Sequence, residues 1–266
     1  MRVQQFGRPV AAAVFVSALF TGTQAVVGQT PEFRWHGMIA QGSAIEVKGV
    51  NGNVRAEASG SNEVEVVAEK RARRSNPEDV RIEVVQHADG VTICAVYPSR
   101  DASRPNVCAP GHEGRMNVQD NDVTVNFTVR VPAGVRLIGT TVNGEVEALR
   151  LNGPIALSTV NGSVTFSTSA SGKATTVNGT IRGELGRADW TDTLEFSTVN
   201  GSINLTLPPD LSTDVKAQTV NGDISTDFPL TVTGRISRRR LEGTIGSGGR
   251  TLSLETVNGG ISLKRS

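Results

Sequence analysis

The amino-acid sequence predicts an all-β protein, and within that class a β-solenoid of stacked coils. The tripeptide Val-Asn-Gly occurs seven times along the chain, far more often than chance allows. After most copies, apolar and polar residues alternate with a period of two, which is typical of a half-buried β-strand. Beyond residue 25 no segment shows the sustained 3.6-residue pattern of an amphipathic helix.

Residues 1–25 have the pattern of a secretory signal peptide. Arg2 and Arg8 precede the apolar run VAAAVFVSALF, and small residues around Ala25 form a cleavage site. The apolar run is about half of the roughly 20 residues that a membrane span needs. We therefore expect an exported protein, periplasmic or at the cell surface, with no membrane-spanning segment after signal removal.

Residues 31–137 predict an N-terminal β region that varies the same repeat. Apolar positions alternate on both sides of the first Val-Asn-Gly, and residues 123–131 form a regularly alternating strand. Residues 98–121 break the pattern with loop-forming residues and are interpreted as an insertion. Because open solenoid ends invite edge-to-edge aggregation, we expect the region to cap the first coil.

Cys94 and Cys108 are the two cysteines of the chain. In an exported protein they favour a disulfide, which should add about 3 kcal/mol of stability in the chain-entropy model. Two free thiols or a metal site are the alternatives, although no Cys-x-x-Cys spacing is present.

Residues 138–266 predict the solenoid proper, a single-stranded β-helix-like stack in which each Asn-Gly forms a corner. An antiparallel β meander with every turn at one end is the alternative. A meander does not need nearly identical turns, whereas stacked coils place identical residues above one another and allow asparagine ladders. The expected corners over the whole chain are Asn51-Gly52, Asn143-Gly144, Asn161-Gly162, Asn178-Gly179, Asn200-Gly201, Asn221-Gly222 and Asn258-Gly259.

Two motifs and the serial repeat resemble the bacterial DUF4097 family of proposed adhesins. The segment from Ile45 to Val54 reads IEVKGVNGNV, and the segment from Val129 to Val135 reads VRVPAGV before the Thr-Val-Asn-Gly copies begin. The resemblance covers roughly residues 40–266. It implies a β-solenoid without an assigned enzymatic activity, so no catalytic residue is carried over. The 98–121 insertion with its two cysteines departs from the family pattern.

Charge and composition exclude some functions. The chain has 27 Lys and Arg against 26 Asp and Glu, which argues against nucleic-acid binding. His36, His87 and His112 lie far apart in the sequence and do not form a metal-binding motif. We expect no cofactor, no metal and no catalytic residue.

One alternative is a carbohydrate-active β-helix enzyme that uses surface carboxylates. Its candidates are Glu145 and Glu147 after one corner, and Asp189, Asp192 and Glu195 in a longer coil. Trp190 in that coil could stack on a sugar ring as a ligand contact, or it could be buried against the solenoid.

Together these observations predict an exported, non-enzymatic protein of the cell envelope, an adhesin-like binding or structural module with a repetitive polar β surface. The expected partner is an unknown envelope protein or polysaccharide. An envelope-stress sensing module is a third alternative.

Overall fold

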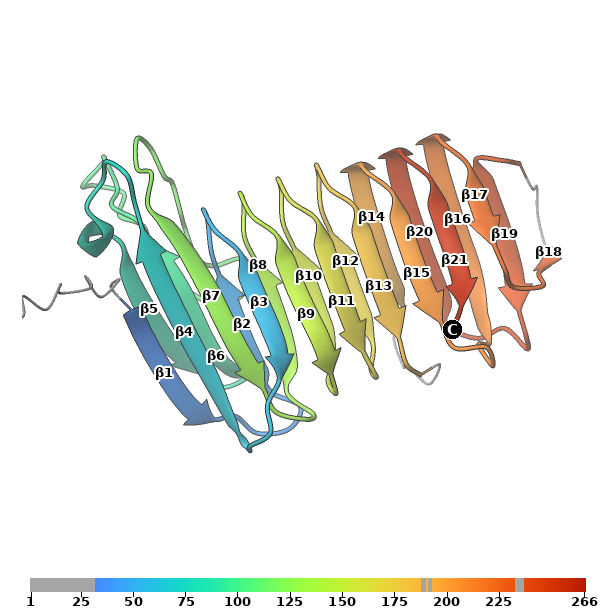
Figure 1. The fold of residues 1–266 in the computed structure, drawn as a ribbon, viewed down its shortest axis with the longest axis horizontal. Helices are drawn as coiled ribbons and strands as arrows, with labels where there is room; N and C mark the ends of the chain where they lie inside the picture. Colours follow the sequence, from blue (N-terminus) through green and yellow to red (C-terminus); the bar gives the residue numbers. More distant parts are fainter. Residues whose placement is uncertain (1–31, 188–189, 191–192, 233–236) are drawn as a thin grey trace, which may run out of the picture.

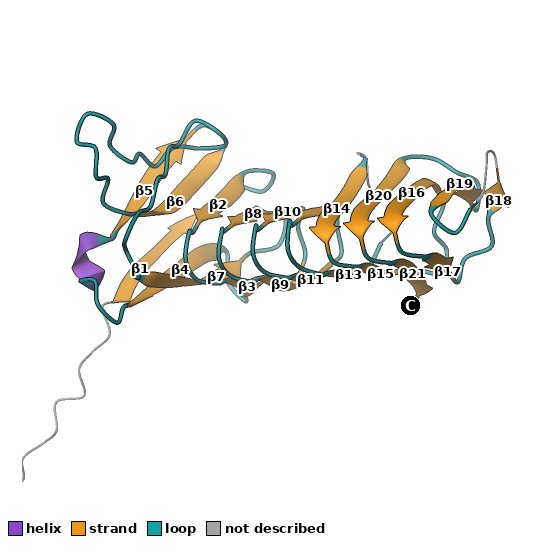
Figure 2. Ribbon diagram, turned by 90° about the horizontal axis from the view of Figure 1, so that it is seen from above, coloured by secondary structure: helices purple, strands orange, loops and turns teal. Residues whose placement is uncertain are grey.

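The computed structural model of the chain describes residues 32–187, 190, 193–232 and 237–266. The expected signal peptide, residues 1–25, lies outside this part. Two large mixed sheets face each other along a rod, as Figures 1 and 2 show. The described residues contain one short 3-10 helix, Pro77–Asp79, and otherwise strands and connections. The prediction of an all-β protein is confirmed, and the fold is β-solenoid-like.

Sheet A contains, in spatial order, β1 (Glu32–Met38), β4 (Glu63–Arg71), β7 (Thr124–Val131), β3 (Val54–Ala58), β9 (Val146–Leu151), β11 (Val164–Thr168), β13 (Ile181–Leu185), β15 (Ile203–Leu207), β21 (Ile261–Arg265) and β17 (Ile224–Thr226). Sheet B contains β18 (Thr231–Val232), β19 (Arg240–Ile245), β16 (Thr213–Asn221), β20 (Thr251–Asn258), β14 (Leu194–Asn200), β12 (Gly172–Thr175), β10 (Ile155–Ser158), β8 (Arg136–Thr140), β2 (Ala44–Lys48), β6 (Gly90–Val96) and β5 (Arg81–His87).

Strand pairing along the middle of the rod is parallel. Sheet A pairs β9 with β11, β11 with β13 and β13 with β15 in parallel, and sheet B pairs β8 with β10 and β10 with β12 likewise. Each turn of the chain therefore contributes one strand to each sheet, and the next turn stacks on it. The alternative of an antiparallel meander is wrong, because consecutive strands cross between the sheets instead of pairing as hairpins.

The stacking order in space differs from the order in the sequence. β20 lies between β14 and β16, and β21 lies between β15 and β17, so the last turn of the chain is inserted inside the rod. In Figure 1 the red strands β20 and β21 interrupt the orange ones. At the other end, β2 lies between β6 and β8.

Antiparallel strands complete both ends. β4 pairs with β7 and β1 with β4, while β5 pairs with β6; at the far end β19 pairs with β16 and β18 with β19. The end strand β18 has only two residues, which limits pairing with another chain. The division of the chain into residues 31–137 and 138–266 stays a prediction.

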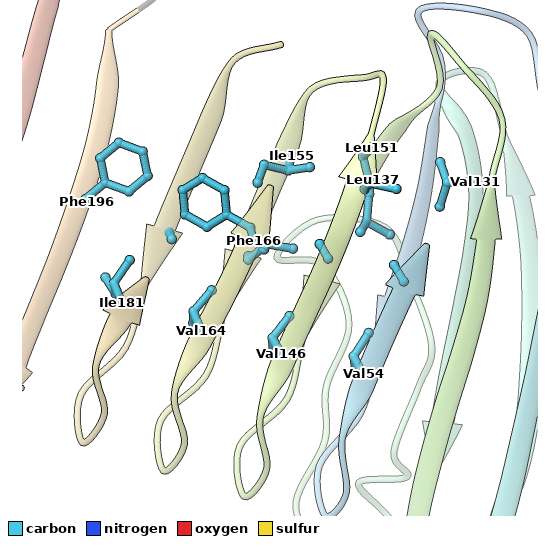
Figure 3. Packing of buried hydrophobic residues seen from close by; sticks show 14 of the residues in the cluster. Val54, Val131, Leu137, Val146, Leu151, Ile155, Val164, Phe166, Ile181 and Phe196 are labelled. Atoms are coloured by element: carbon cyan, nitrogen blue, oxygen red, sulfur yellow. The ribbon is translucent and has the colours of Figure 1, made fainter. Parts of the chain in front are cut away.

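The core is built from columns of identical or similar side chains. Val54, Val146, Val164 and Ile181 are paired in register across β3, β9, β11 and β13, and all four are buried. Figure 3 shows them in one row. This burial follows from the period-two pattern after each corner. No helix among the described residues has the length and apolar character needed to cross a membrane.

Candidate binding surfaces

The asparagines of the repeat form a hydrogen-bonded ladder along one edge of the rod, where teal connections link the two sheets in Figure 2. Each side-chain amide nitrogen donates to the Oδ1 atom of the preceding asparagine, over 2.8–2.9 Å. In spatial order the ladder contains Asn51, Asn143, Asn161, Asn178, Asn200, Asn258 and Asn221. Because every amide points the same way, the bonds polarise one another in one direction.

The glycines bring neighbouring corners close together. A Cβ atom on Gly162 would lie 2.0 Å from the carbonyl oxygen of Gly144, and the other corner glycines stacked on a preceding corner repeat this distance within 0.1 Å. Only Gly52 and Gly259 among the seven corner glycines have positive φ angles, 122° and 158°. Positive φ therefore does not explain most of these glycines; the close approach of the neighbouring backbones requires them.

Threonine completes the corner. The buried Thr159 donates from Oγ1 to the carbonyl oxygen of Gly144 over 2.8 Å. The same bond joins the threonine of each later corner to the glycine of the neighbouring one. Threonine, asparagine and glycine thus each make a separate contact between stacked corners, which explains why the residues repeat so closely.

The valine of the repeat has no such internal role at most corners. Val142, Val160, Val177 and Val199 are each 38–39% exposed, and Val220 is 48% exposed. We call these five valines and the seven ladder asparagines the valine–asparagine edge. It places an apolar row beside a polar row along the rod, whereas the sequence indicated a polar surface alone.

The 98–121 insertion connects β6 to β7 and is attached to the outer side of sheet B. Cys94 on β6 and Cys108 in the insertion form a disulfide with a Cα–Cα distance of 5.7 Å. The Lys48 ammonium donates to the carbonyl oxygens of Ala109 and Gly111 over 2.5 and 2.6 Å. The insertion is therefore attached both covalently and by hydrogen bonds.

The buried Glu46 supports the same attachment. Its carboxylate accepts hydrogen bonds from Thr92 Oγ1 at 2.8 Å and from the Gly111 backbone N–H at 3.1 Å, and it lies 3.4 Å from the Lys48 ammonium. These two charged residues alternate with apolar residues in the sequence segment AIEVK, which predicts an exposed strand face. Sequence reasoning missed their role because only the insertion makes that face buried.

A cavity of about 900 Å³ lies between the insertion and strands β2, β6 and β8. Its lining reaches the first rungs of the ladder, Asn51 and Asn143. The break in the repeat at residues 98–121 was the signal in the sequence that pointed to the insertion, but nothing in the sequence indicated the cavity itself.

The carboxylates of the proposed enzyme do not converge. Glu147 lies on β9 of sheet A and is 3.2 Å from the Arg55 guanidinium, while Glu195 lies on β14 of sheet B and is 3.5 Å from the Lys173 ammonium. Glu145 is exposed beside its corner. Asp189 and Asp192 lie outside the described residues.

Trp190 is 6% exposed and belongs to the hydrophobic core, so its ring offers little surface to a sugar. His36 lies 3.8 Å from Glu63, and His87 shares a hydrogen bond of 3.1 Å with Thr92. Within the described part of the chain, no group of three or more His, Cys, Asp or Glu residues could hold a metal ion.

The structure is that of a β-solenoid-like repeat protein, with stacked parallel turns, an asparagine ladder at the corners and antiparallel strands at both ends. The chain belongs to the Toastrack DUF4097 family, whose model matches residues 40–264. No protein with a curated description matches the sequence.

One known structure agrees at the level of the fold. A proposed cell adhesion protein from Clostridium sporogenes matches with a TM-score of 0.50 and 12% identity, over 89% of this chain and 100% of its own. A proposed adhesin from Bacteroides fragilis matches with a TM-score of 0.33 and 12% identity, over 88% of this chain and 98% of its own.

Proposed function

We propose that the protein is an exported, non-enzymatic module of the cell envelope that binds its partner in the manner of an adhesin, with the Val-Asn-Gly corner as the repeating unit. The observation that carries the proposal is the valine–asparagine edge. Val142, Val160, Val177 and Val199 are exposed, although the valine or isoleucine four positions after each of them is buried. Exposed apolar rows bordered by polar groups are typical of interaction surfaces.

The regular spacing of the edge favours a partner that itself repeats. Neighbouring turns lie about 4.8 Å apart, as paired strands do, so the edge offers the same contact several times in a row. Weak contacts made in parallel add to a substantial affinity even when each contributes little. An envelope polysaccharide or an extended segment of an envelope protein has the required form.

Export is supported by three observations of different kinds. Residues 1–25 carry the signal-peptide pattern, and the Cys94–Cys108 disulfide suits an oxidising compartment. The names of the fold neighbours, a proposed cell adhesion protein and a proposed adhesin, fit a location at the cell surface.

The proposal is tested by pull-down from envelope extracts and by a glycan array, with the exported chain as bait. The variant Val160→Lys/Val177→Lys/Val199→Lys places charges on the apolar row. If each valine contributes about 0.5 kcal/mol, binding weakens by about tenfold. The matched control Asn204→Lys/Gln218→Lys/Ser225→Lys adds three charges at exposed positions away from the edge and should bind as the parent does. Equal loss in both variants would contradict a role of the edge.

A screen for polysaccharide cleavage distinguishes the proposal from the enzymatic alternative. Under the non-enzymatic proposal, the parent protein should show no cleavage activity. Cleavage that is abolished by Glu145→Gln or Asp192→Asn would overturn the non-enzymatic proposal.

A further inference from the structure

The asparagine ladder ends at the cavity beneath the insertion. The neighbouring turn, β6 to β7, has no Val-Asn-Gly corner; the 98–121 insertion stands in that place. Asn51 accepts from Asn143 but, among the described residues, has no acceptor for its own amide nitrogen. Since all amides of the ladder point the same way, the last N–H donor of the chain of hydrogen bonds is directed toward the side on which the cavity lies.

This terminal donor is well suited to an acceptor group of a ligand. Six amides behind it are polarised in the same direction, which strengthens the outermost N–H as a donor. A carboxylate is the strongest acceptor available, because hydrogen bonds to an ionised acceptor are about twice as strong as neutral ones.

The charges that line the cavity favour an anion over a cation. Glu46 and Lys48 neutralise each other and already hold the insertion, and Asp120 is paired with Arg100. Arg115 lines the cavity and, within the described part of the chain, has no carboxylate at ion-pair distance, although it contributes to the low pKa of Asp101, which is due mainly to Ser103. Its guanidinium is therefore available to a ligand.

Apolar side chains form much of the remaining wall, beside the polar His112, Asn117, Asn121 and Thr140. The apolar residues are Val50, Val107, Met116, Val118, Ile138 and Val142. The volume of about 900 Å³ is in the range of small-molecule sites, which combine apolar walls with a few polar groups that orient the ligand. Val142 also belongs to the valine–asparagine edge, so an apolar path leads from the cavity onto the exposed row.

We propose that this cavity binds a linear aliphatic carboxylate, with the carboxylate between the Asn51 amide and the Arg115 guanidinium and the tail against Met116 and its apolar neighbours. A flexible tail is favoured over a rigid ring because the apolar walls continue along the rod. The cavity shares Asn51, Val142 and Asn143 with the valine–asparagine edge, but the edge variants at Val160, Val177 and Val199 leave its lining unchanged. Loss of one site therefore leaves the other testable, since the cavity takes a small molecule and the edge takes a macromolecule.

The test uses decanoate as the probe, followed through the side-chain amide signals in 1H-15N NMR spectra of the exported chain. Decanoate should shift the Asn51 amide and saturate. Acetate, which lacks the tail, and decyltrimethylammonium, which lacks the carboxylate, should each bind at least about tenfold more weakly. Equal binding of decanoate and decyltrimethylammonium, or no shift with decanoate, would overturn the proposal.

Variants separate binding from stability. Arg115→Gln should weaken decanoate binding by about tenfold or more, because a hydrogen bond to a charged group is lost. Asn51→Ala should weaken it as well. Asn178→Ala removes two ladder bonds and part of the polarisation but leaves the Asn51 donor in place, so it should weaken decanoate binding less than Asn51→Ala does. If Asn178→Ala weakens binding as much as Asn51→Ala, or if Arg115→Gln has no effect, the proposal fails.

Discussion

The ring of Phe166 occupies the space that a side chain at Gly183 would need. A Cβ atom on Gly183 would lie 2.1 Å from Phe166 Cζ, and the two residues are direct partners in the parallel pair β11–β13. The ring crosses the core and stacks on Phe196 of sheet B, with centroids 5.6 Å apart and planes at 8°. The absent side chain in one turn thus makes room for an aromatic pair formed by the turns on either side of it.

Gly183→Ala should destabilise the protein by about 1–3 kcal/mol, because the new methyl group overpacks the core against a ring that is itself held by stacking. Chemical denaturation with and without the substitution measures the change. A smaller residue at the partner position should relieve it, so Gly183→Ala should cost less in a Phe166→Leu background. Simple additivity of the two substitutions would contradict this relationship.

Gly162→Ala should be more severe than most surface substitutions, at about 3 kcal/mol or more, because the methyl group would meet the Gly144 carbonyl oxygen and push two turns apart. Gly60→Ala is the matched control, since a Cβ atom there meets nothing within 4 Å. It should change the unfolding free energy by about 0.5 kcal/mol or less. Similar effects of the two alanines would show that the corners tolerate wider spacing.

Thr159→Val keeps the size of the side chain and removes the hydroxyl that donates to Gly144. The Gly144 carbonyl oxygen loses this partner at a partly buried position, so we expect the free energy of unfolding to fall by about 1–2 kcal/mol in denaturant unfolding. Thr165→Val is the control, because Thr165 is partly exposed on the outer side of β11 and makes no hydrogen bond of its side chain among the described residues. If Thr159→Val leaves the free energy of unfolding unchanged, water replaces the hydroxyl as the hydrogen-bond donor.

The pKa of Asp122 is lowered to about 2, mainly by the backbone N–H of Ser75, which donates to its carboxylate over 2.8 Å. Because the folded-state pKa lies below the unfolded value of about 3.9, the ionised carboxylate stabilises the fold at higher pH. That contribution is complete above about pH 5 and is lost as the pH falls through 4 toward 2. The stability difference between parent and Asp122→Asn should shrink over this range. An NMR titration of the Asp122 carboxyl with a midpoint near pH 4 would contradict the lowered pKa.

Much of the fold could be predicted from the sequence because the repeat leaves its period in the side chains. Val146, Val164 and Ile203 follow their corners at the same distance, and all three are buried. The serial Thr-Val-Asn-Gly also distinguished stacked turns from hairpins. The pattern could not explain why each corner residue is needed. The corner glycine, for example, is required because the backbone of the adjacent corner lies against it, and this contact exists only in the stacked structure.

The cavity and the stacking order were beyond sequence reasoning for a related reason. Arg115 and Met116 gain a role only because a disulfide and Lys48 hold the insertion over sheet B. Nearly identical corners also make every stacking order look alike in the sequence, because any turn carries the contacts that any other turn needs. Trp190, in contrast, could be placed by sequence reasoning, since its ring is buried, which is one of the two interpretations that the sequence allowed.

The placement of β20 and β21 between earlier turns has a consequence for how the rod assembles. A regular solenoid can grow turn by turn, but here β16 and β17 have no parallel neighbour until β20 and β21 are present. The rod can therefore close only after these two strands have been synthesised. A chain cut short after Gly249 would lack a layer in the interior of the rod, which leaves an unpaired edge on β14 and β16 in sheet B and on β15 and β17 in sheet A. The turn formed by β20 and β21 joins the strands on either side of it, so both sheets are continuous only when this turn is in place.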